Sequence, residues 1–193
     1  PATIALFIAS NLIVSALFGY GSFSETSVEN SAQALFYFAF GLPAFSLIKV
    51  FSSFFFARHD TKTPFYISLV SVLLNILISV LLFQKVGFII IPIATSISSW
   101  FNAIFLYIFS KKKDFFVFND IFIYRFPRIL ISSLIMGLIF YFLLNLLSEK
   151  LIYSENLKFI YLLLSIFVAF TSYVAVSIFT KAFKMSDINL KYK

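Results

Sequence analysis

Long apolar stretches, nearly free of charged side chains, are the feature that most restricts how this chain can fold. A helix crosses roughly 30 Å of bilayer hydrocarbon with about 20 residues, whereas the strands of a transmembrane barrel are about ten residues of alternating pattern. The chain is 61% hydrophobic and 12% charged, too few charges for a soluble surface. We therefore predict an all-α integral membrane protein with six transmembrane helices, at residues 2–18, 32–57, 65–83, 88–109, 129–147 and 159–180.

The distribution of Lys and Arg predicts how these spans are oriented. Cytoplasmic loops close to span ends are enriched in cations, while translocated loops are not. Eleven of the 15 Lys and Arg follow the second, fourth and sixth spans, and three follow the third and fifth. Both ends of the chain are therefore predicted to be cytoplasmic. Topology and contact with anionic membrane lipids explain the net charge of +7, so no nucleic-acid partner is needed.

The connections between the spans carry further signals. Thr63 followed by Pro64 predicts the start of a helix, with the hydroxyl at the N-cap and proline at the first helical position. Residues 115–128 are rich in aromatic side chains and flanked by cations, which is typical of a segment at the cytoplasmic membrane surface. We accordingly divide the chain into four spans within residues 1–114, the interfacial segment 115–128, and two further spans with a tail at 129–193.

Few ionisable residues are available for chemistry. The absence of Cys excludes disulfides and thiolate metal sites, and no Asp or Glu lies inside a predicted span. Lys49 does lie well inside a span, where exposure to lipid costs about 2.5–3.5 kcal/mol or more. We predict that Lys49 faces a cavity. The alternative is that its long side chain reaches toward the cytoplasmic interface, roughly 13 Å away.

Three polar residues, Asn75, Ser79 and Thr95, fall at similar depth in the third and fourth predicted spans. Their neutral oxygen atoms are a candidate site for a monovalent cation. The alternative, which is the more frequent role of such residues, is hydrogen bonding between membrane helices at about 0.6 kcal/mol each.

A dense charged group, Arg58, Asp60 and Lys62, follows the second predicted span. Arg offers bidentate donors to phosphate oxygens and Lys a mobile charge, so this group is a candidate site for a diphosphate headgroup. The alternative is ordinary anchoring by cytoplasmic cations, with an ion pair between Arg58 and Asp60.

Residues 47–64 contain a motif in which a lysine inside a span is followed by an aromatic, a small residue, Arg, Asp, a cation, Thr and Pro. The motif residues are Lys49, Phe56, Ala57, Arg58, Asp60, Lys62, Thr63 and Pro64. Together with the glycine-containing turn at 18–23 and the hairpin at Gly87, this pattern resembles the lipid II flippase family, also called MurJ or MviN. The resemblance extends over nearly the whole chain. It implies the carboxyl-terminal part of a longer MOP-type exporter, which has two helical bundles around a central cavity and, in this family, two extra helices.

The resemblance also implies a transporter rather than an enzyme. Such a protein would flip an undecaprenyl-diphosphate-linked peptidoglycan precursor across the bacterial plasma membrane by alternating access, with cell-wall synthesis proteins as partners. The last two spans would hold the lipid tail. A monovalent cation at Asn75, Ser79 and Thr95, or the membrane potential, would drive transport without any other cofactor. The residues that match the family pattern near the headgroup are Lys49, Arg58, Asp60 and Lys62.

Other functions are compatible with the same spans. A related exporter of polysaccharide-linked lipids or drugs would share the fold, and a non-transporting scaffold or truncated copy would share the helices. A membrane glycosyl- or phosphotransferase would need paired carboxylates or histidines at the interface, where His59 and Asp60 are the candidates.

Overall fold

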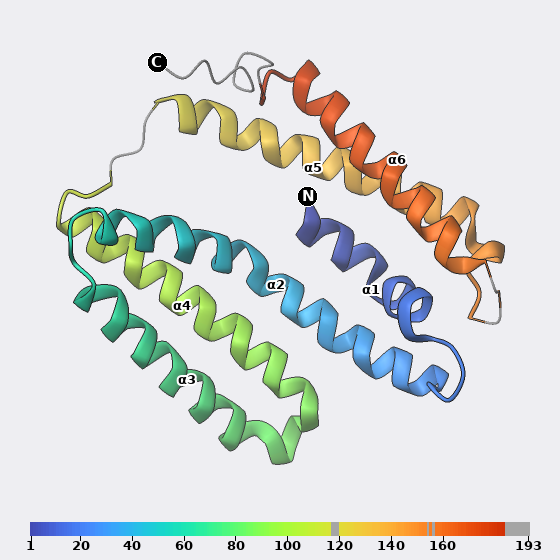
Figure 1. Ribbon diagram of the computed structural model, residues 1–193, viewed down its shortest axis with the longest axis horizontal. Helices are drawn as coiled ribbons and strands as arrows, with labels where there is room; N and C mark the ends of the chain where they lie inside the picture. Colours follow the sequence, from blue (N-terminus) through green and yellow to red (C-terminus); the bar gives the residue numbers. More distant parts are fainter. Residues whose placement is uncertain (117–119, 154, 156, 184–193) are drawn as a thin grey trace. The chain divides into compact units, whose positions relative to one another are not determined.

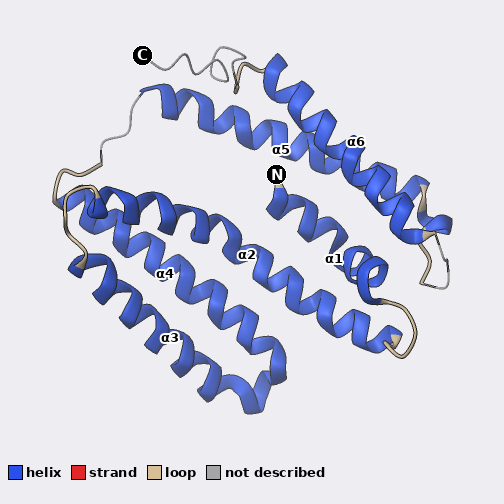
Figure 2. Cartoon of the chain, viewed as in Figure 1, coloured by secondary structure: helices blue, strands red, loops and turns tan. Residues whose placement is uncertain are grey.

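The computed structural model describes residues 1–116, 120–153, 155 and 157–183, and every regular element within them is helical (Figures 1 and 2). A helix satisfies its own backbone hydrogen bonds without water, which is the condition for burying these stretches in hydrocarbon. Three lysines of the predicted cytoplasmic tail, Lys184, Lys191 and Lys193, lie outside the described residues. The elements are α1 (Ala2–Phe18), α2 (Glu25–Phe56), α3 (Lys62–Val86), the 3-10 helix η1 (Gly87–Ile89), α4 (Ile90–Lys112), α5 (Asp120–Leu146), the 3-10 helix η2 (Ser148–Lys150) and α6 (Lys158–Phe179).

The helices form two compact units, and the boundary between the units falls within α2, after Ala32. The second unit covers residues 33–117, and in it α3 and α4 form an antiparallel hairpin (Figure 1). Gly87 turns the chain at the tip with a φ of 76°, a conformation that glycine adopts without steric cost. α2 lies close to α4. Ser96 Oγ on α4 donates a hydrogen bond of 2.6 Å to the Tyr37 carbonyl oxygen on α2. The buried core at the opposite end consists of Phe51, Phe55, Ile67 and Leu106.

The first unit covers residues 1–32 and 118–193, and in it α1 packs against α5 and α6. Small residues allow this approach, as is usual between membrane helices. A Cβ atom added at Gly137 on α5 would lie 2.6 Å from Ile4 Cγ2 on α1. The buried core residues of this unit are Ala9, Ala16, Met136, Phe140, Leu144, Leu151, Leu162 and Ala169.

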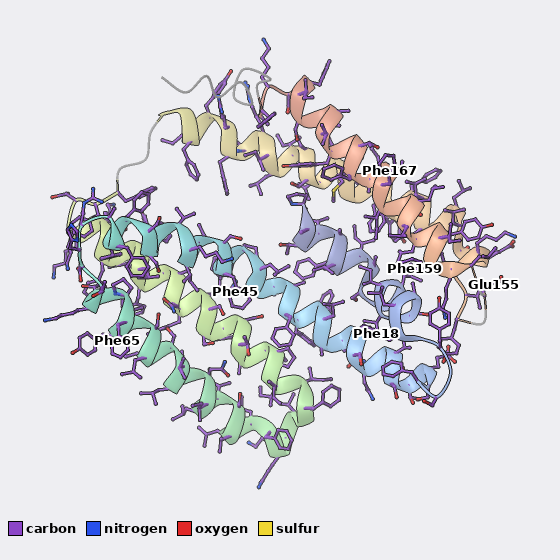
Figure 3. All side chains as sticks on the ribbon, in the orientation of Figure 1. Phe18, Phe45, Phe65, Glu155, Phe159 and Phe167 are labelled. Carbon is purple, nitrogen blue, oxygen red and sulfur yellow. The ribbon has the colours of Figure 1, made fainter. Side chains whose placement is uncertain are left out.

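Large apolar side chains cover the outward faces of the helices. Phe65 on α3 is 63% exposed and Phe167 on α6 is 67% exposed, and both point away from their helices (Figure 3). Such faces are unfavourable in water and favourable in lipid. Four stretches of the described residues are long and apolar enough to cross a membrane: Glu25–Phe56, Lys62–Lys112, Phe122–Leu146 and Lys158–Phe179.

The predicted spans each coincide with a helix, but six separate crossings remain a prediction. α1 matches the predicted range 2–18, yet with 17 residues it is shorter than the four candidate spans. The stretch Lys62–Lys112 contains both α3 and α4.

Two helices begin before the predicted spans that they match, and one predicted helix start was wrong. α2 begins at Glu25, seven residues before the predicted span 32–57, and Ser24 Oγ accepts the Ser27 N–H at 3.2 Å in its first turn. α3 begins at Lys62 rather than at Pro64. α5 begins at Asp120, so the described part of the predicted interfacial segment from residue 120 onward is continuous with the following span. Residues 117–119 of that segment lie outside the described residues.

The contact between α1 and α5 can be tested with Gly137→Val. The added methyl groups enter space that Ile4 occupies, and overpacking of this kind typically costs about 1–3 kcal/mol. We expect a lower thermal unfolding midpoint in neutral detergent. Leu138→Val is the matched control, because the neighbouring Leu138 side chain is 71% exposed. Equal midpoints for the two variants would contradict close packing at this position.

Candidate functional site

The connection between α2 and α3 contains the charged group that the sequence singled out. His59 reverses the chain there with a φ of 58°. The backbone N–H groups of Arg58 and Asp60 both donate to the Phe55 carbonyl oxygen, each at 3.0 Å. Since the Phe55 side chain is completely buried, the turn is anchored to the core of the second unit.

Asp60 organises the start of α3. Its Oδ1 accepts the Thr63 N–H at 3.1 Å, and its Oδ2 accepts the Thr63 hydroxyl at 2.8 Å and the Lys113 ammonium at 2.5 Å. A carboxylate in this position satisfies a first-turn amide that has no partner within the helix. The predicted N-cap at Thr63 was therefore wrong: the N-cap residue is Thr61, whose side chain makes no capping bond, and Asp60, one residue earlier, supplies the hydrogen bond to the first turn. Pro64 has no N–H, so the first helical bond runs from Phe65 N–H to the Thr61 carbonyl oxygen.

The same contacts determine the charge of Asp60. The hydrogen bond from Lys113, together with those from Thr63, lowers the pKa of Asp60 from 3.8 to about 2. The carboxylate is therefore ionised at neutral pH, and it neutralises Lys113 at the end of α4.

Arg58 does not pair with Asp60, so the predicted ion pair was wrong. The reversal at His59 directs the Arg58 side chain back along α2, where Nη1 donates to the Phe54 carbonyl oxygen at 3.1 Å. Its guanidinium carbon lies 4.5 Å from the centre of the Phe115 ring, a cation–π distance. Arg58 is otherwise exposed, which leaves most of its N–H donors available.

Lys49 and Lys62, the other two predicted headgroup residues, both have exposed side chains. Lys49 lies seven residues before the end of α2, about 10 Å along the helix. Within the part of the chain that the structure describes, neither lysine forms an ion pair. The structure thus brings together Arg58 and Asp60 at one turn and leaves Lys49 further along α2.

The three residues of the predicted cation site do meet between α3 and α4. Asn75 Nδ2 donates to Thr95 Oγ1 at 3.2 Å, and Ser79 Oγ donates to Asn75 Oδ1 at 3.2 Å. The Thr95 hydroxyl proton is directed to the Ile91 carbonyl oxygen at 2.8 Å. The bond from Asn75 to Thr95 is the interhelical hydrogen bond of the alternative interpretation, and the other two lie within α3 and within α4. The Asn75 amide presents its nitrogen to Thr95 and its oxygen to Ser79.

A cavity of about 210 Å³ with a mostly apolar surface adjoins Asn75 and Thr95 within the second unit. Asn102 is 8% exposed, and its Nδ2 donates to Ser68 Oγ at 3.3 Å while its Oδ1 has no partner in the described structure. A cavity of this size has room for water molecules, and its serine, threonine and asparagine side chains offer them hydrogen-bond partners. Its lining consists of Phe45, Ile48, Ser68, Ser71, Val72, Asn75, Thr95, Ser98, Ser99 and Asn102.

Lys158 is a buried cation that sequence reasoning missed, because it was counted as an ordinary loop charge. Its side chain is 1% exposed at the first residue of α6. The ammonium donates to the Gly19 and Tyr153 carbonyl oxygens at 2.8 and 2.6 Å and lies about 4.5 Å from the Tyr20 and Tyr153 rings. A cation at a helix N-terminus opposes the helix dipole, and that unusual placement was the available signal.

The residues proposed for a transferase do not form an acid pair. The Asp60 carboxylate is already bound by Lys113 and Thr63. Among the described residues, no group of three or more His, Cys, Asp or Glu side chains is placed to hold a metal ion.

Comparison with known proteins gives one consistent family. The family model described as lipid II flippase MurJ matches residues 1–163. A probable lipid II flippase MurJ of Rickettsia prowazekii is 39% identical over 113 residues, which cover 58% of this chain and 22% of that protein. The Rhizobium meliloti protein of the same description is 35% identical over 141 residues, covering 73% of this chain and 26% of the relative. The one from Thermotoga maritima is 40% identical over 106 residues, covering 55% and 22%. The chain thus spans about a quarter of the length of these relatives.

The Asp60 contacts predict a graded loss of stability. Asp60→Ala removes both the cap and the ion pair and is expected to cost about 1–2 kcal/mol. Asp60→Asn keeps an acceptor for the Thr63 N–H, and Lys113→Met removes only a partly exposed ion pair, so each should cost less than about 1 kcal/mol. Chemical unfolding in detergent measures these differences. A loss for Lys113→Met as large as that for Asp60→Ala would contradict the dominance of the cap.

The low pKa of Asp60 also predicts the pH dependence of this contribution. Because the folded-state pKa of about 2 lies below the ordinary value of 3.8, the stabilisation is fully present above the ordinary value and lost as the pH falls through about 2. The difference in unfolding free energy between the natural protein and Asp60→Asn should therefore be constant between about pH 5 and pH 8. A difference that shrinks within this range would contradict the assignment.

Proposed function

The chain belongs to the lipid II flippase MurJ family, and we propose that it forms the carboxyl-terminal membrane part of a transporter that moves lipid II from the inner to the outer leaflet of the bacterial plasma membrane. The family match over residues 1–163 carries this proposal. The four apolar helical stretches support a multi-pass membrane protein. In this proposal no covalent bond of the substrate changes, so the protein is a transporter and not an enzyme.

We propose that all six α-helices cross the membrane, with both ends of the chain cytoplasmic. The hairpin of α3 and α4 supports two crossings within Lys62–Lys112, because each helix is 23 residues or longer. The cation asymmetry between alternate loops supports the orientation. The relationship to MOP-type exporters implies that α1 to α4 belong to one of two bundles that rock around a central cavity.

The α2–α3 turn is the proposed contact for the diphosphate of the substrate. Asp60 is neutralised by Lys113, so the turn keeps the uncompensated positive charges of Arg58 and Lys62. Arg58 can offer a bidentate pair of donors to phosphate oxygens, and its packing on Phe115 limits the side-chain entropy lost on binding. Lys49, further along α2, would face the headgroup once it is inside the cavity.

The proposed site for the lipid tail is the surface of α5 and α6, which pack against each other. Their outward side chains are apolar, and exposed examples are Leu138, Phe142, Phe167 and Phe170. An acyl or prenyl chain can slide along such a face without leaving hydrocarbon, so only the polar headgroup needs a cavity.

A monovalent cation bound by Asn75, Ser79 and Thr95 is the proposed source of coupling. The side chains already meet, and on cation binding the Asn75 amide would turn its oxygen toward Thr95, because its nitrogen donates there in the structure. The Ser79 and Thr95 hydroxyl oxygens would then complete the oxygen–cation contacts. The other candidate driving force is the membrane potential, which acts on charged groups at about 2.3 kcal/mol per charge per 100 mV.

Complementation tests the proposed function. The natural full-length protein that contains this chain should restore growth to bacteria depleted of their lipid II flippase. Lys49→Met should slow transport about 10- to 100-fold and abolish rescue, because a charge-assisted headgroup contact contributes about 1.5–3 kcal/mol. Lys85→Met, which removes an exposed lysine from the last turn of α3, is the matched control and should rescue.

The outcomes separate the alternatives. Failure of a well-expressed natural protein to rescue would favour a related exporter of another lipid-linked cargo or a non-transporting scaffold. Rescue by Lys49→Met at the level of the natural protein would remove Lys49 from the headgroup path and leave the flippase assignment intact.

Cation coupling is tested separately, with the full-length protein in liposomes. If a cation at the Asn75 site drives transport, a sodium gradient should accelerate flipping by the natural protein and have no effect on Asn75→Ala. The variant should lose only about 0.6 kcal/mol of stability, the usual value of an interhelical hydrogen bond. Gln84→Ala on the same helix is the control and should keep the sodium response. Insensitivity of the natural protein to sodium would favour the membrane potential.

A further inference from the structure

Two connections lie at the same end of the first unit: the turn between α1 and α2, and the segment between α5 and α6 (Figure 1). They are joined by residues to which the proposed transport path assigns no role. Tyr153 and Lys158 belong to the α5–α6 side, and Gly19, Tyr20 and Phe23 belong to the α1–α2 turn. All five lie in the same compact unit, so the contacts among them are internal to it.

The Lys158 ammonium is the centre of this junction. Its side chain is 1% exposed, and within the described residues it forms no ion pair. Burying a cation without a counter-ion is costly unless hydrogen bonds and ring faces replace its water. The Gly19 carbonyl oxygen accepts at 2.8 Å and the Tyr153 carbonyl oxygen at 2.6 Å. The centres of the Tyr20 and Tyr153 rings lie 4.4 and 4.5 Å away. The ammonium therefore takes one carbonyl oxygen and one ring from each connection.

Tyr153 supplies a second tie, which is neutral. Its hydroxyl donates to the Phe23 carbonyl oxygen at 2.5 Å. Its ring lies against Gly19, because a Cβ atom added at Gly19 would be 3.0 Å from Tyr153 Cε2. The same Cβ atom would be only 2.5 Å from the Ser15 carbonyl oxygen on α1. Glycine at this position therefore lets the Tyr153 ring pack closely on the turn while its hydroxyl bonds the far side of the turn.

The opposite end of α1 is fastened to α5 as well. Ile4 packs so closely on Gly137 that a Cβ atom added there would lie 2.6 Å from Ile4 Cγ2. Between the two attachments α1 is kinked at Ala9, which has a φ of −120° and is completely buried. α1 is thus held by the α5–α6 pair near both of its ends.

We propose that Lys158 and Tyr153 form a permanent latch between the α1–α2 turn and the α5–α6 connection, so that α1, α5 and α6 move together when the protein changes conformation. Opening the latch would leave a buried ammonium and several backbone carbonyl oxygens without partners, which is costly. In the proposed transporter, on which this consequence rests, α1 belongs to a rocking bundle and α5 and α6 hold the lipid tail. The latch would carry the tail-binding helices along with that bundle.

Hydrogen exchange tests the latch without reference to any cargo. In the natural full-length protein in neutral detergent, Lys158→Met keeps the apolar stem and removes the ammonium. The amides of residues 19–24 should then exchange at least about tenfold faster, because charge-assisted hydrogen bonds no longer hold the turn closed. Exchange in α3, which lies in the second unit, should not change. Lys150→Met is the matched control, because it removes an exposed lysine of the same connection.

Tyr153→Phe is a milder second variant. It keeps the ring and removes only the hydroxyl that bonds the Phe23 carbonyl oxygen, so the same amides should exchange about threefold faster. Unchanged exchange at residues 19–24 in both variants would overturn the latch. An acceleration of the same size in α3 would overturn it too, because that result indicates a general loss of stability.

A cross-link distinguishes a permanent latch from a gate that opens. This chain contains no Cys, so Phe23→Cys and Tyr153→Cys can be introduced into the full-length protein, with any cysteines outside this chain replaced. A short, reducible bifunctional thiol reagent then joins the two positions. In liposomes, the cross-linked protein should flip lipid II at least as fast as it does after reduction. Tyr153→Cys alone, treated with the same reagent, is the control.

The outcomes of the cross-link are distinct. Slower flipping that recovers on reduction would show that the two connections must separate during transport, and would overturn the permanent latch. If the natural protein itself flips no lipid II, the proposed cargo is wrong, and the hydrogen exchange of residues 19–24 still decides whether the latch exists.

Discussion

A peptide group in hydrocarbon has no water to bond, so each N–H and C=O must find its partner inside the protein. This constraint explains why every described element is a helix and why the exceptions occur where they do. The chain leaves helical geometry at Gly19, at His59 and at Gly87, and the first two turns are held by specific bonds. The Gly19 carbonyl oxygen accepts from the Lys158 ammonium. The turn at His59 is closed on Phe55 and capped by Asp60.

Charged groups are scarce in this chain, and those with a structural role satisfy several partners at once. Asp60 accepts three hydrogen bonds, and Lys158 contacts two carbonyl oxygens and two rings. Arg58, Lys49 and Lys62 differ, because their side chains are exposed and form no ion pair within the described structure. This contrast separates cations that hold the fold from cations that are available for the proposed contact with a phosphate group.

Much of the candidate site could be predicted from the sequence. The contacts that could not be predicted join residues that are far apart in the chain. The grouping of Arg58, Asp60 and Lys62 in one turn follows from their spacing, and the meeting of Asn75 with Thr95 follows from two helices joined by a tight turn. The pairing of Asp60 with Lys113 could not be predicted, because the two residues are 53 positions apart and several other cations were equally plausible partners. The burial of Lys158 depends likewise on Gly19, which lies 139 positions away.

The amino-acid sequence by itself determined that the chain is helical, that it is built for lipid, and which turns carry charge. These properties depend on hydrophobicity and local spacing. Both can be determined for each stretch of sequence without knowing what packs against it. Only the tertiary structure decided which buried polar atoms are hydrogen-bonded and which have no partner in the described structure. Ser15 and Ser71 are the same residue type in similar apolar helices, yet Ser71 donates to its own helix and Ser15 has no partner. That difference arises from the rotamer and the neighbouring helix at each position, and neither is encoded by composition or period.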